Sequence, residues 1–327
     1  MLFYSGSDSR DGNASDVVLW REDTDGLTKL SSIPLLSPSW VVPHPRLPIL
    51  YAVQETEPGE VVVVEVAPDG SLSERQRTHS HGVWPCHLTV DPGGERLVAS
   101  NYGDGTVAMW SLALDGVISE PSRVWQLSGS GPVTDRQERA HAHMAALRDE
   151  TILVADLGSD AIIELGLDGS DRIKLSLPPG FGPRHFVMVG DGRAVLVGEL
   201  SAELALIDLG SQTRILDIEP TTKLAGALPS GITTNGREVI VANRAVGTIA
   251  AFTVEDQRLV RGEEIRLPAD EPRAISSDGT RVFVCLQDAG QIAAYTIDNG
   301  NDPQLTPAPH VSDFGAIPWS LDEADRS

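Results

Sequence analysis

The chain has 327 residues, 41% of them hydrophobic and 22% charged, and its 25 Lys and Arg against 47 Asp and Glu give a formal net charge of −22. This composition is typical of a globular protein with a substantial core, and the negative charge argues against nucleic acid or an anionic membrane surface as a partner. The two cysteines, Cys86 and Cys285, are too few for a disulfide framework and form no CxxC motif, so neither a structural zinc nor a redox motif is expected.

Targeting signals are not evident in the sequence. No run approaches 18 consecutive apolar residues, and the start, MLFYSGSDSR, lacks the basic and apolar regions of a secretory signal. We therefore expect a soluble, cytoplasmic protein with no membrane partner.

One pattern recurs along the chain: a β-rich run, a polar or glycine-containing turn, a second β-rich run and often a closing Asp-Gly. A degenerate copy spans 2–20, and clearer copies begin at Tyr51, Leu97, Ile152, Ala194, Val239 and Val282. The residues just before the turns are spaced by 46, 55, 43, 44 and 43 positions, in the order Glu55, Asn101, Asp156, Glu199, Asn243 and Leu286. This period is typical of a four-stranded propeller blade.

A second marker precedes each turn. It is a proline in six blades, with His141 in its place in the fourth: Pro38, Pro85, Pro183, Pro229, Pro272 and Pro318. Each marker opens a short apolar run, which we interpret as the innermost strand A, and the run before the turn is then strand B. Proline suits the first residue of a strand, because no ladder hydrogen bond is lost there.

The two ends of the chain carry complementary half-repeats. The chain starts with a B-like strand, while IPWSLDE at 317–323 is an A-like strand with no B strand after it. The C-terminal strand is therefore expected to complete the N-terminal blade and to remove an open sheet edge. The prediction is an all-β fold, a single seven-bladed β-propeller domain over 1–327. An open β-sandwich array or a β-helix would not explain the half-repeats.

The two markers should bring polar side chains to one opening. Strands A and B form an antiparallel hairpin, so the start of A and the end of B share an edge, and A lies nearest the axis. The expected rim contains Glu55, His87, His143, Asp156, Arg184, His185, Glu199, Arg244 and Arg273. Three arginines on an acidic protein favour an anionic substrate. For Asp156 and Asn101, at positions typical of turns, a structural role is favoured.

The longest interval between turns contains the polar, glycine-rich segment 127–140, LSGSGPVTDRQERA, which leads directly into HAHM. A long loop that enters a candidate site is a hypothesis for a lid. A plain surface loop is the alternative, and the sequence does not separate the two.

Several motifs resemble the lactonase family of seven-bladed propellers, which includes propeller-type bacterial 6-phosphogluconolactonase and fungal carboxy-muconate cycloisomerase. They are WPCHLTVDPGGERLVASNYGDGTV, HAHM followed by VADLGSDAI, GFGPRHFV followed by GEL, VANRAVGTIAAF, and EPRAISSDGTRVF. By position, the resemblance implies a cleft built from His143, Arg184, Glu199 and Arg244, which the rim geometry also selects. We assign these four to catalysis and assign substrate binding to His185, Arg273, His87 and His141. No metal or cofactor is expected.

The resemblance implies hydrolysis of a sugar lactone, with 6-phospho-D-glucono-1,5-lactone as the leading substrate and a small anionic lactone as the partner. The acidic composition is consistent with a monomer, which we expect. Either neutral His143 or the Glu199 carboxylate would activate water, and arginines would hold the oxyanion and the phosphate, in an order left open. Three alternatives remain: a cycloisomerase acting on a muconate-type dicarboxylate, a calcium-dependent lactonase, and a non-enzymatic peptide-binding propeller.

Overall fold

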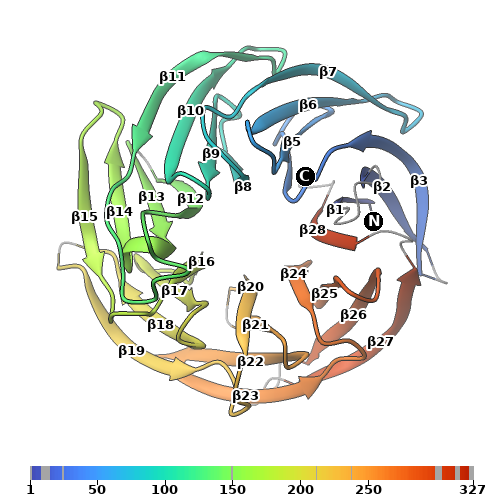
Figure 1. Ribbon diagram of the computed structural model, residues 1–327. Helices are drawn as coiled ribbons and strands as arrows, with labels where there is room; N and C mark the ends of the chain where they lie inside the picture. The colour runs from blue at the N-terminus through green and yellow to red at the C-terminus, as the bar shows by residue number, and fades with distance from the viewer. Residues whose placement is uncertain are drawn as a thin grey trace.

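Seven four-stranded antiparallel sheets stand in a ring around a central axis in the computed structural model (Figure 1). The structure describes residues 2–8, 15–23, 26–148, 150–210, 212–236, 238–298, 304–313 and 317–323. These residues form 28 strands, and the only helical element among them is the 3₁₀ turn η1, Leu157–Ser159. The predicted all-β, seven-bladed propeller is confirmed. No helix in the described ranges has the length and apolar character needed to cross a membrane.

The strands of the first four blades run outward from the axis in the following order. Blade 1 is β28 (Ile317–Glu323), β1 (Leu2–Asp8), β2 (Ser15–Asp23) and β3 (Gly26–Leu35). Blade 2 is β4 (Val41–Pro43), β5 (Ile49–Gln54), β6 (Glu60–Val66) and β7 (Leu72–His79). Blade 3 is β8 (Pro85–Val90), β9 (Arg96–Asn101), β10 (Thr106–Leu112) and β11 (Ile118–Gln126). Blade 4 is β12 (Ala142–Arg148), β13 (Thr151–Asp156), β14 (Ala161–Gly166) and β15 (Asp171–Ser176).

The remaining three blades follow the same order. Blade 5 is β16 (Pro183–Met188), β17 (Arg193–Gly198), β18 (Glu203–Asp208) and β19 (Arg214–Pro220). Blade 6 is β20 (Leu228–Thr234), β21 (Glu238–Arg244), β22 (Thr248–Glu255) and β23 (Arg258–Arg266). Blade 7 is β24 (Pro272–Ser277), β25 (Arg281–Leu286), β26 (Gln291–Asp298) and β27 (Gln304–Asp313).

The core lies between neighbouring blades, since the middle strands of each blade are covered on both faces. Such strands read as continuous apolar, β-branched runs, as in β5 (ILYAVQ), where all six residues are buried. Between blades 2 and 3, Tyr51 and Trp110 fill the interface, and the Tyr51 hydroxyl donates to the Gly116 carbonyl at 2.8 Å. The outer strand β7 is mostly exposed and polar.

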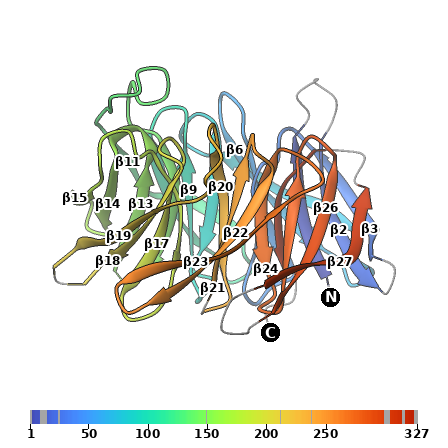
Figure 2. The same cartoon turned by 90° about the horizontal axis from the view of Figure 1, so that it is seen from below.

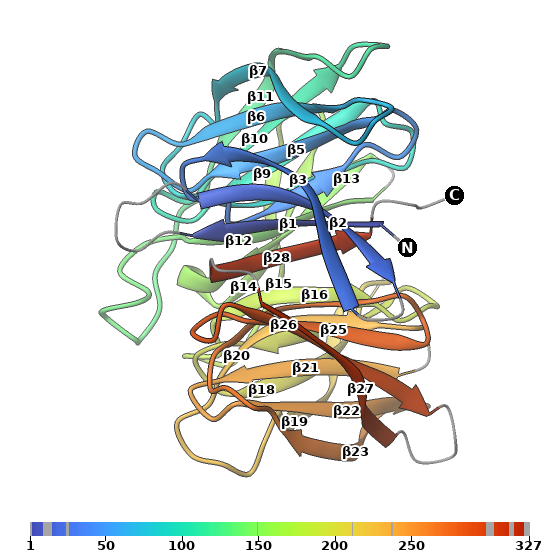
Figure 3. The ribbon, with the colours of Figure 1, turned by 90° about the vertical axis from the view of Figure 1, so that its right-hand side faces the viewer.

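The ring is closed between the two ends of the chain. Strand β28 pairs with β1 in antiparallel register, with Tyr4 opposite Asp322 and Ser5 opposite Leu321, and the two strands lie side by side (Figure 3). Phe3 and Phe283 pack across the seam between blades 1 and 7, with ring centroids 4.7 Å apart. The predicted closure of the first blade by the C-terminal strand is thus confirmed.

The strand register corrects one part of the sequence interpretation. In blades 3, 6 and 7 the marker proline faces the residue that marks the turn after strand B in the repeat, as Pro85 faces Asn101. In blade 4 the residue in that place is Ala142, which faces Asp156, so the choice of His141 was wrong by one position. His143 is therefore equivalent to Cys86 and not to His87.

A register shift follows the first residue of strand A in four blades, and the second residue, Pro229, in blade 6, as expected for a β-bulge. A bulge leaves one residue outside the ladder and re-aims its side chain. In four of these blades the residue just after the first position is Cys86, His143, Arg184 or Arg273, and all four side chains line the cavity described below. The bulges therefore explain how strand A directs functional side chains toward the axis of the propeller.

The closure of blade 1 can be tested by truncation. A chain that ends at residue 316 lacks β28 and leaves the edge of β1 unpaired, so its midpoint of thermal unfolding should fall by more than about 5 °C. A chain that ends at residue 323 keeps β28 and serves as the control in the same calorimetric measurement. Equal midpoints for the two truncations would contradict the observed pairing.

Candidate active site

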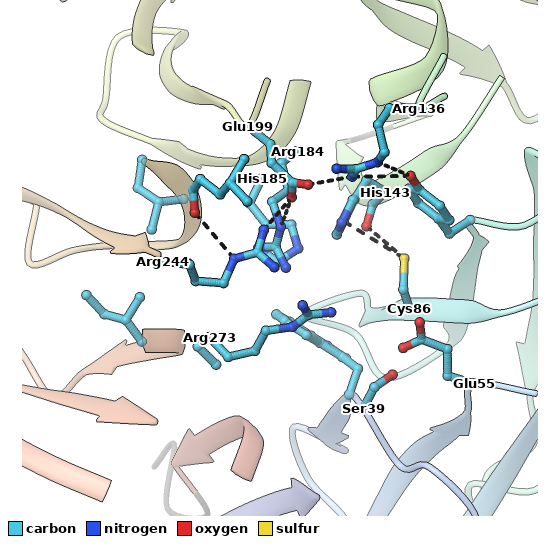
Figure 4. A pocket seen from close by; sticks show the side chains of 17 residues that line it. Ser39, Glu55, Cys86, Arg136, His143, Arg184, His185, Glu199, Arg244 and Arg273 are labelled. Atoms are coloured by element: carbon cyan, nitrogen blue, oxygen red, sulfur yellow. Dashed lines mark hydrogen bonds and ion pairs between the residues drawn. The ribbon is translucent and has the colours of Figure 1, made fainter. Parts of the chain in front are cut away.

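A cavity of about 350 Å³ opens at the centre of the ring (Figure 4). This volume suits a small metabolite. The side chains that line it come from blades 2 to 7 and from the β11–β12 loop: Ser39, Trp40, Glu55, Cys86, Tyr102, Arg136, His143, Arg184, His185, Glu199, Leu228, Gly231, Ile232, Arg244, Arg273, Ala274 and Ile275. All four residues assigned to catalysis are present, together with His185 and Arg273. Within the described residues, no group of three or more His, Cys, Asp or Glu side chains is arranged to hold a metal ion.

Glu199 is the centre of an ion cluster. Its Oε2 lies 2.8 Å from Arg184 Nε and 3.0 Å from Arg244 Nη2, while its Oε1 lies 2.5 Å from Arg136 Nη2. The carboxylate is almost fully buried. Burial alone would raise the pKa of Glu199, but the surrounding cations, Arg244 and Arg184 foremost, hold it well below its usual range. Glu199 is thus an anion with both oxygens occupied, which makes it a poor proton acceptor.

Arg184 connects the ion cluster to the imidazoles. Its Nη1 donates to the Ser230 carbonyl at 2.7 Å and lies 3.2 Å from His185 Nδ1. Burial lowers the pKa of Arg184 to about 9, against the opposing effect of Glu199, so the guanidinium is still charged at neutral pH. Because Arg184 donates to Nδ1, we assign the proton of neutral His185 to Nε2.

Three buried imidazoles, those of His87, His143 and His185, lie together near Arg184. The ring centroids of His143 and His185 are 5.1 Å apart, and those of His87 and His185 are 5.7 Å apart. Burial, assisted by the charge of Arg184, lowers the pKa of His87 to about 3 and the pKa values of His143 and His185 well below 6.5. All three are therefore neutral at pH 7. The cavity thus contains a neutral imidazole, His143, next to a cationic cluster.

Cys86 occupies the bulge position in blade 3, next to His143. Its Sγ donates to the His143 carbonyl at 3.4 Å and lies 3.9 Å from His143 Nδ1. Burial raises the pKa of the Cys86 thiol, so it remains protonated at neutral pH. Cys86 therefore packs against the backbone and the ring of His143 as a neutral group.

Two residues predicted to bind substrate are not brought to the cavity. His87 is back in the strand ladder opposite Ser100, and its ring packs against Trp40 with centroids 4.5 Å apart. His141 precedes β12, and its ring stacks on Tyr102, with centroids 4.5 Å apart, while Nδ1 lies 2.7 Å from the Tyr102 carbonyl. Both rings support side chains that line the cavity and do not themselves line it.

Asp156 and Asn101 have the structural contacts favoured for them from the sequence. The Asp156 carboxylate accepts hydrogen bonds from the backbone N–H groups of His141 at 2.7 Å and Gly158 at 3.1 Å, which caps η1. The Asn101 amide donates to the carbonyls of Ser80 and Thr106. Neither residue lines the cavity.

Sequence reasoning missed Arg136, which reaches the cavity from the β11–β12 loop. The base of this loop is anchored by Gln137, which is fully buried and donates from Nε2 to the Leu157 carbonyl at 2.8 Å and to Asp160 Oδ1 at 2.7 Å. Segment 127–140, for which a lid is one hypothesis, is therefore held at the η1 turn by Gln137, the residue that follows Arg136. The sequence held no signal that distinguishes Arg136 from Arg139, because only the packing of Gln137 decides which one faces inward.

The ion cluster predicts a large effect of removing its central charge. Glu199→Gln keeps the shape of the side chain but leaves buried Arg184 and Arg244 without a counter-charge, so the free energy of unfolding should fall by about 3–5 kcal/mol. Glu74→Gln breaks the exposed pair with Arg77 and should cost less than about 1 kcal/mol. Urea denaturation of both variants measures the difference, and equal losses would contradict the central role of Glu199.

The buried imidazoles predict how stability depends on pH. The unfolded chain binds protons at these histidines below about pH 6.5, whereas the folded chain does not, so stability should fall as the pH drops from 7 to 5. Each histidine contributes a slope of up to about 1.4 kcal/mol per pH unit. Urea denaturation across this range should give a smaller slope for His87→Gln than for wild type, with exposed His79→Gln as the control. An unchanged slope in His87→Gln would contradict a neutral, buried His87.

Comparisons with known proteins agree with this architecture. The model of the family described as "Lactonase, 7-bladed beta-propeller" matches residues 3–310. The chain is 27% identical over 242 residues to a 6-phosphogluconolactonase of Bacillus subtilis, which covers 67% of each chain, and 25% identical over 265 residues to one of Formosa agariphila, which covers 75% of each. The structure of a periplasmic gluconolactonase of Pseudomonas aeruginosa superimposes with a TM-score of 0.87 at 20% identity, covering 98% of this chain and 99% of that one. With the family match extending over nearly all of the propeller, the chain belongs to the lactonase family of seven-bladed β-propellers.

Proposed function

We propose that this protein hydrolyses a sugar lactone, and that the lactone is 6-phospho-D-glucono-1,5-lactone. The observation that carries the proposal is a cavity in which neutral His143 lies beside several arginines. The names of the curated relatives from Bacillus subtilis and Formosa agariphila support the same activity.

The charges that line the cavity favour an anionic substrate. Four arginines, Arg136, Arg184, Arg244 and Arg273, face two carboxylates, Glu55 and Glu199. The lining is therefore cationic on a chain whose formal net charge is −22. Guanidinium groups bind phosphate and carboxylate through paired hydrogen bonds, which suits a phosphorylated lactone and its acid product.

In the proposed mechanism, His143 acts as the general base. It accepts a proton from water as the water oxygen attacks the lactone carbonyl, and the carbonyl π electrons move onto oxygen to form a tetrahedral oxyanion. Arginine stabilises this charge. The intermediate then collapses, the ring C–O bond breaks, and the proton on His143 passes to the leaving alkoxide, which yields the free acid and its hydroxyl group.

The assignment of the base to His143 follows from the state of Glu199. Both oxygens of Glu199 are held in ion pairs with arginines, so this carboxylate orients Arg184 and Arg244 and does not accept a proton. The low pKa of His143 makes it a weak base in the free protein. A bound phosphate would place negative charge near the imidazole and raise its pKa, and the lactone is itself reactive toward water, so modest general-base catalysis suffices.

An alternative reaction, the assembly state and the cellular location are further expectations from the sequence. A muconate-type dicarboxylate would also suit the arginines, but the relatives found carry the name of a phosphogluconolactonase, and product analysis on each substrate separates the two reactions. The monomeric state and the cytoplasmic location remain predictions; the Pseudomonas aeruginosa neighbour is named as periplasmic.

The proposed function predicts the effect of removing the base or the central arginine. His143→Ala and Arg184→Ala should each lower kcat/KM for 6-phospho-D-glucono-1,5-lactone at least about tenfold, because the first removes the general base and the second removes a positive charge from the cavity lining next to it. Rates are corrected for spontaneous hydrolysis, and circular dichroism checks the fold. Exposed Arg172→Ala is the control. Activity close to wild type in both site variants would contradict the assignment of these residues to the active site.

A further inference from the structure

We infer that Arg136, which reaches the cavity from the β11–β12 loop, binds the anionic group of the substrate and sets the preference for a phosphorylated over an unphosphorylated lactone. This inference rests on the proposed lactonase function. Arg136 differs from the other arginines of the ion cluster because it comes from a loop between blades and not from a strand of a blade. The loop extends beyond the strands on one face of the ring (Figure 2).

The contacts of the three arginines that pair with Glu199 are unequal. Arg184 and Arg244 each also donate to a backbone carbonyl, that of Ser230 and that of Leu228, and their side chains are only 5% and 10% exposed. These two guanidinium groups are therefore part of the interior. Moving either one toward a ligand would break contacts within the blades.

Arg136 is more open to a ligand. Its side chain is 37% exposed, and among the described residues its guanidinium donates hydrogen bonds only to Glu199 Oε1 and to the Tyr102 hydroxyl, the latter at 3.4 Å from Nε and Nη2. No described group accepts a hydrogen bond from its Nη1. Arginine presents its donors as a planar fork that matches phosphate oxygens, so the open side of Arg136 is a ready contact for an anion.

The anchored loop holds this contact in place before the substrate arrives. Gln137, the next residue, is buried and bonded to Leu157 and Asp160. The loop also runs so close to η1 that a Cβ added at Gly158 would lie 1.8 Å from the Arg139 carbonyl oxygen. A preorganised arginine loses less conformational freedom on binding, which favours affinity.

The position of Arg136 separates substrate binding from the chemical step. Figure 4 shows Arg136 at one end of the cavity, near His143 and across from Arg273. Tyr102 neighbours both residues, since its hydroxyl accepts a hydrogen bond from Arg136 and its ring centroid is 5.6 Å from that of His143. An anion held by Arg136 would therefore leave the imidazole free to act on water.

The test compares wild type with Arg136→Gln on 6-phospho-D-glucono-1,5-lactone and on unphosphorylated glucono-1,5-lactone. KM for the phosphorylated lactone should rise about 10- to 100-fold with kcat nearly unchanged, because a charge-assisted contact is lost equally from the ground and transition states. KM for the unphosphorylated lactone should rise at least about tenfold less, because that substrate lacks the phosphate contact, whereas any change in the Glu199 cluster affects both lactones alike. Arg139→Gln, on the same loop and 61% exposed, is the matched control.

Calorimetric binding of the product 6-phosphogluconate, with gluconate as its unphosphorylated counterpart, gives a second measurement that does not depend on turnover. Arg136→Gln should weaken binding of the phosphorylated acid about 10- to 100-fold more than binding of gluconate, because only the former loses the contact with phosphate. Equal losses for both ligands, or no loss for either, would overturn the inference and leave Arg136 as a support for Glu199. A wild-type protein that binds 6-phosphogluconate through Arg136 but hydrolyses neither lactone would overturn the proposed function alone.

Discussion

The ion cluster around Glu199 is the interaction on which the candidate site depends. One carboxylate, almost without contact with water, holds guanidinium groups from β16, from β21 and from the β11–β12 loop. A buried charge is tolerated only when it is paired, so the loss of one partner destabilises the others. The same pairs remove Glu199 from acid–base chemistry and fix Arg184 against His185. The electrostatics of the cavity and the packing of blades 5 and 6 with the β11–β12 loop therefore depend on the same contacts.

The neutral imidazoles are a second consequence of the ion cluster and of its burial. His87, His143 and His185 lie close to a cation and away from water, and both conditions disfavour the charged form. The cavity can thus be cationic through its arginines while it keeps an unprotonated nitrogen at neutral pH. Separating these tasks between two residue types allows one site to attract an anion and to accept a proton.

Much of this arrangement could be predicted from the sequence, because period and strand order determine which residues reach the axis. The seven blades, the closure by 317–323 and the gathering of His143, Arg184, Glu199 and Arg244 all followed from two markers. The register in blade 4 was missed by one residue, since Ala142 stands there in place of the marker proline and gives no distinctive signal in the sequence. Arg136 was missed for a different reason: its direction depends on where Gln137 is buried, which is a property of the folded chain.

The bulge at the start of strand A has a consequence for how such an enzyme can diverge. A residue outside the ladder can be exchanged without disturbing the hydrogen bonds of its sheet, and equivalent positions in this one chain already hold a thiol, an imidazole and two guanidinium groups, at Cys86, His143, Arg184 and Arg273. Each of these blades thus has one position at which the side chain can change while the strand ladder stays the same. Substitutions at a few of these bulge positions, one blade at a time, can therefore change the substrate while the propeller fold is retained.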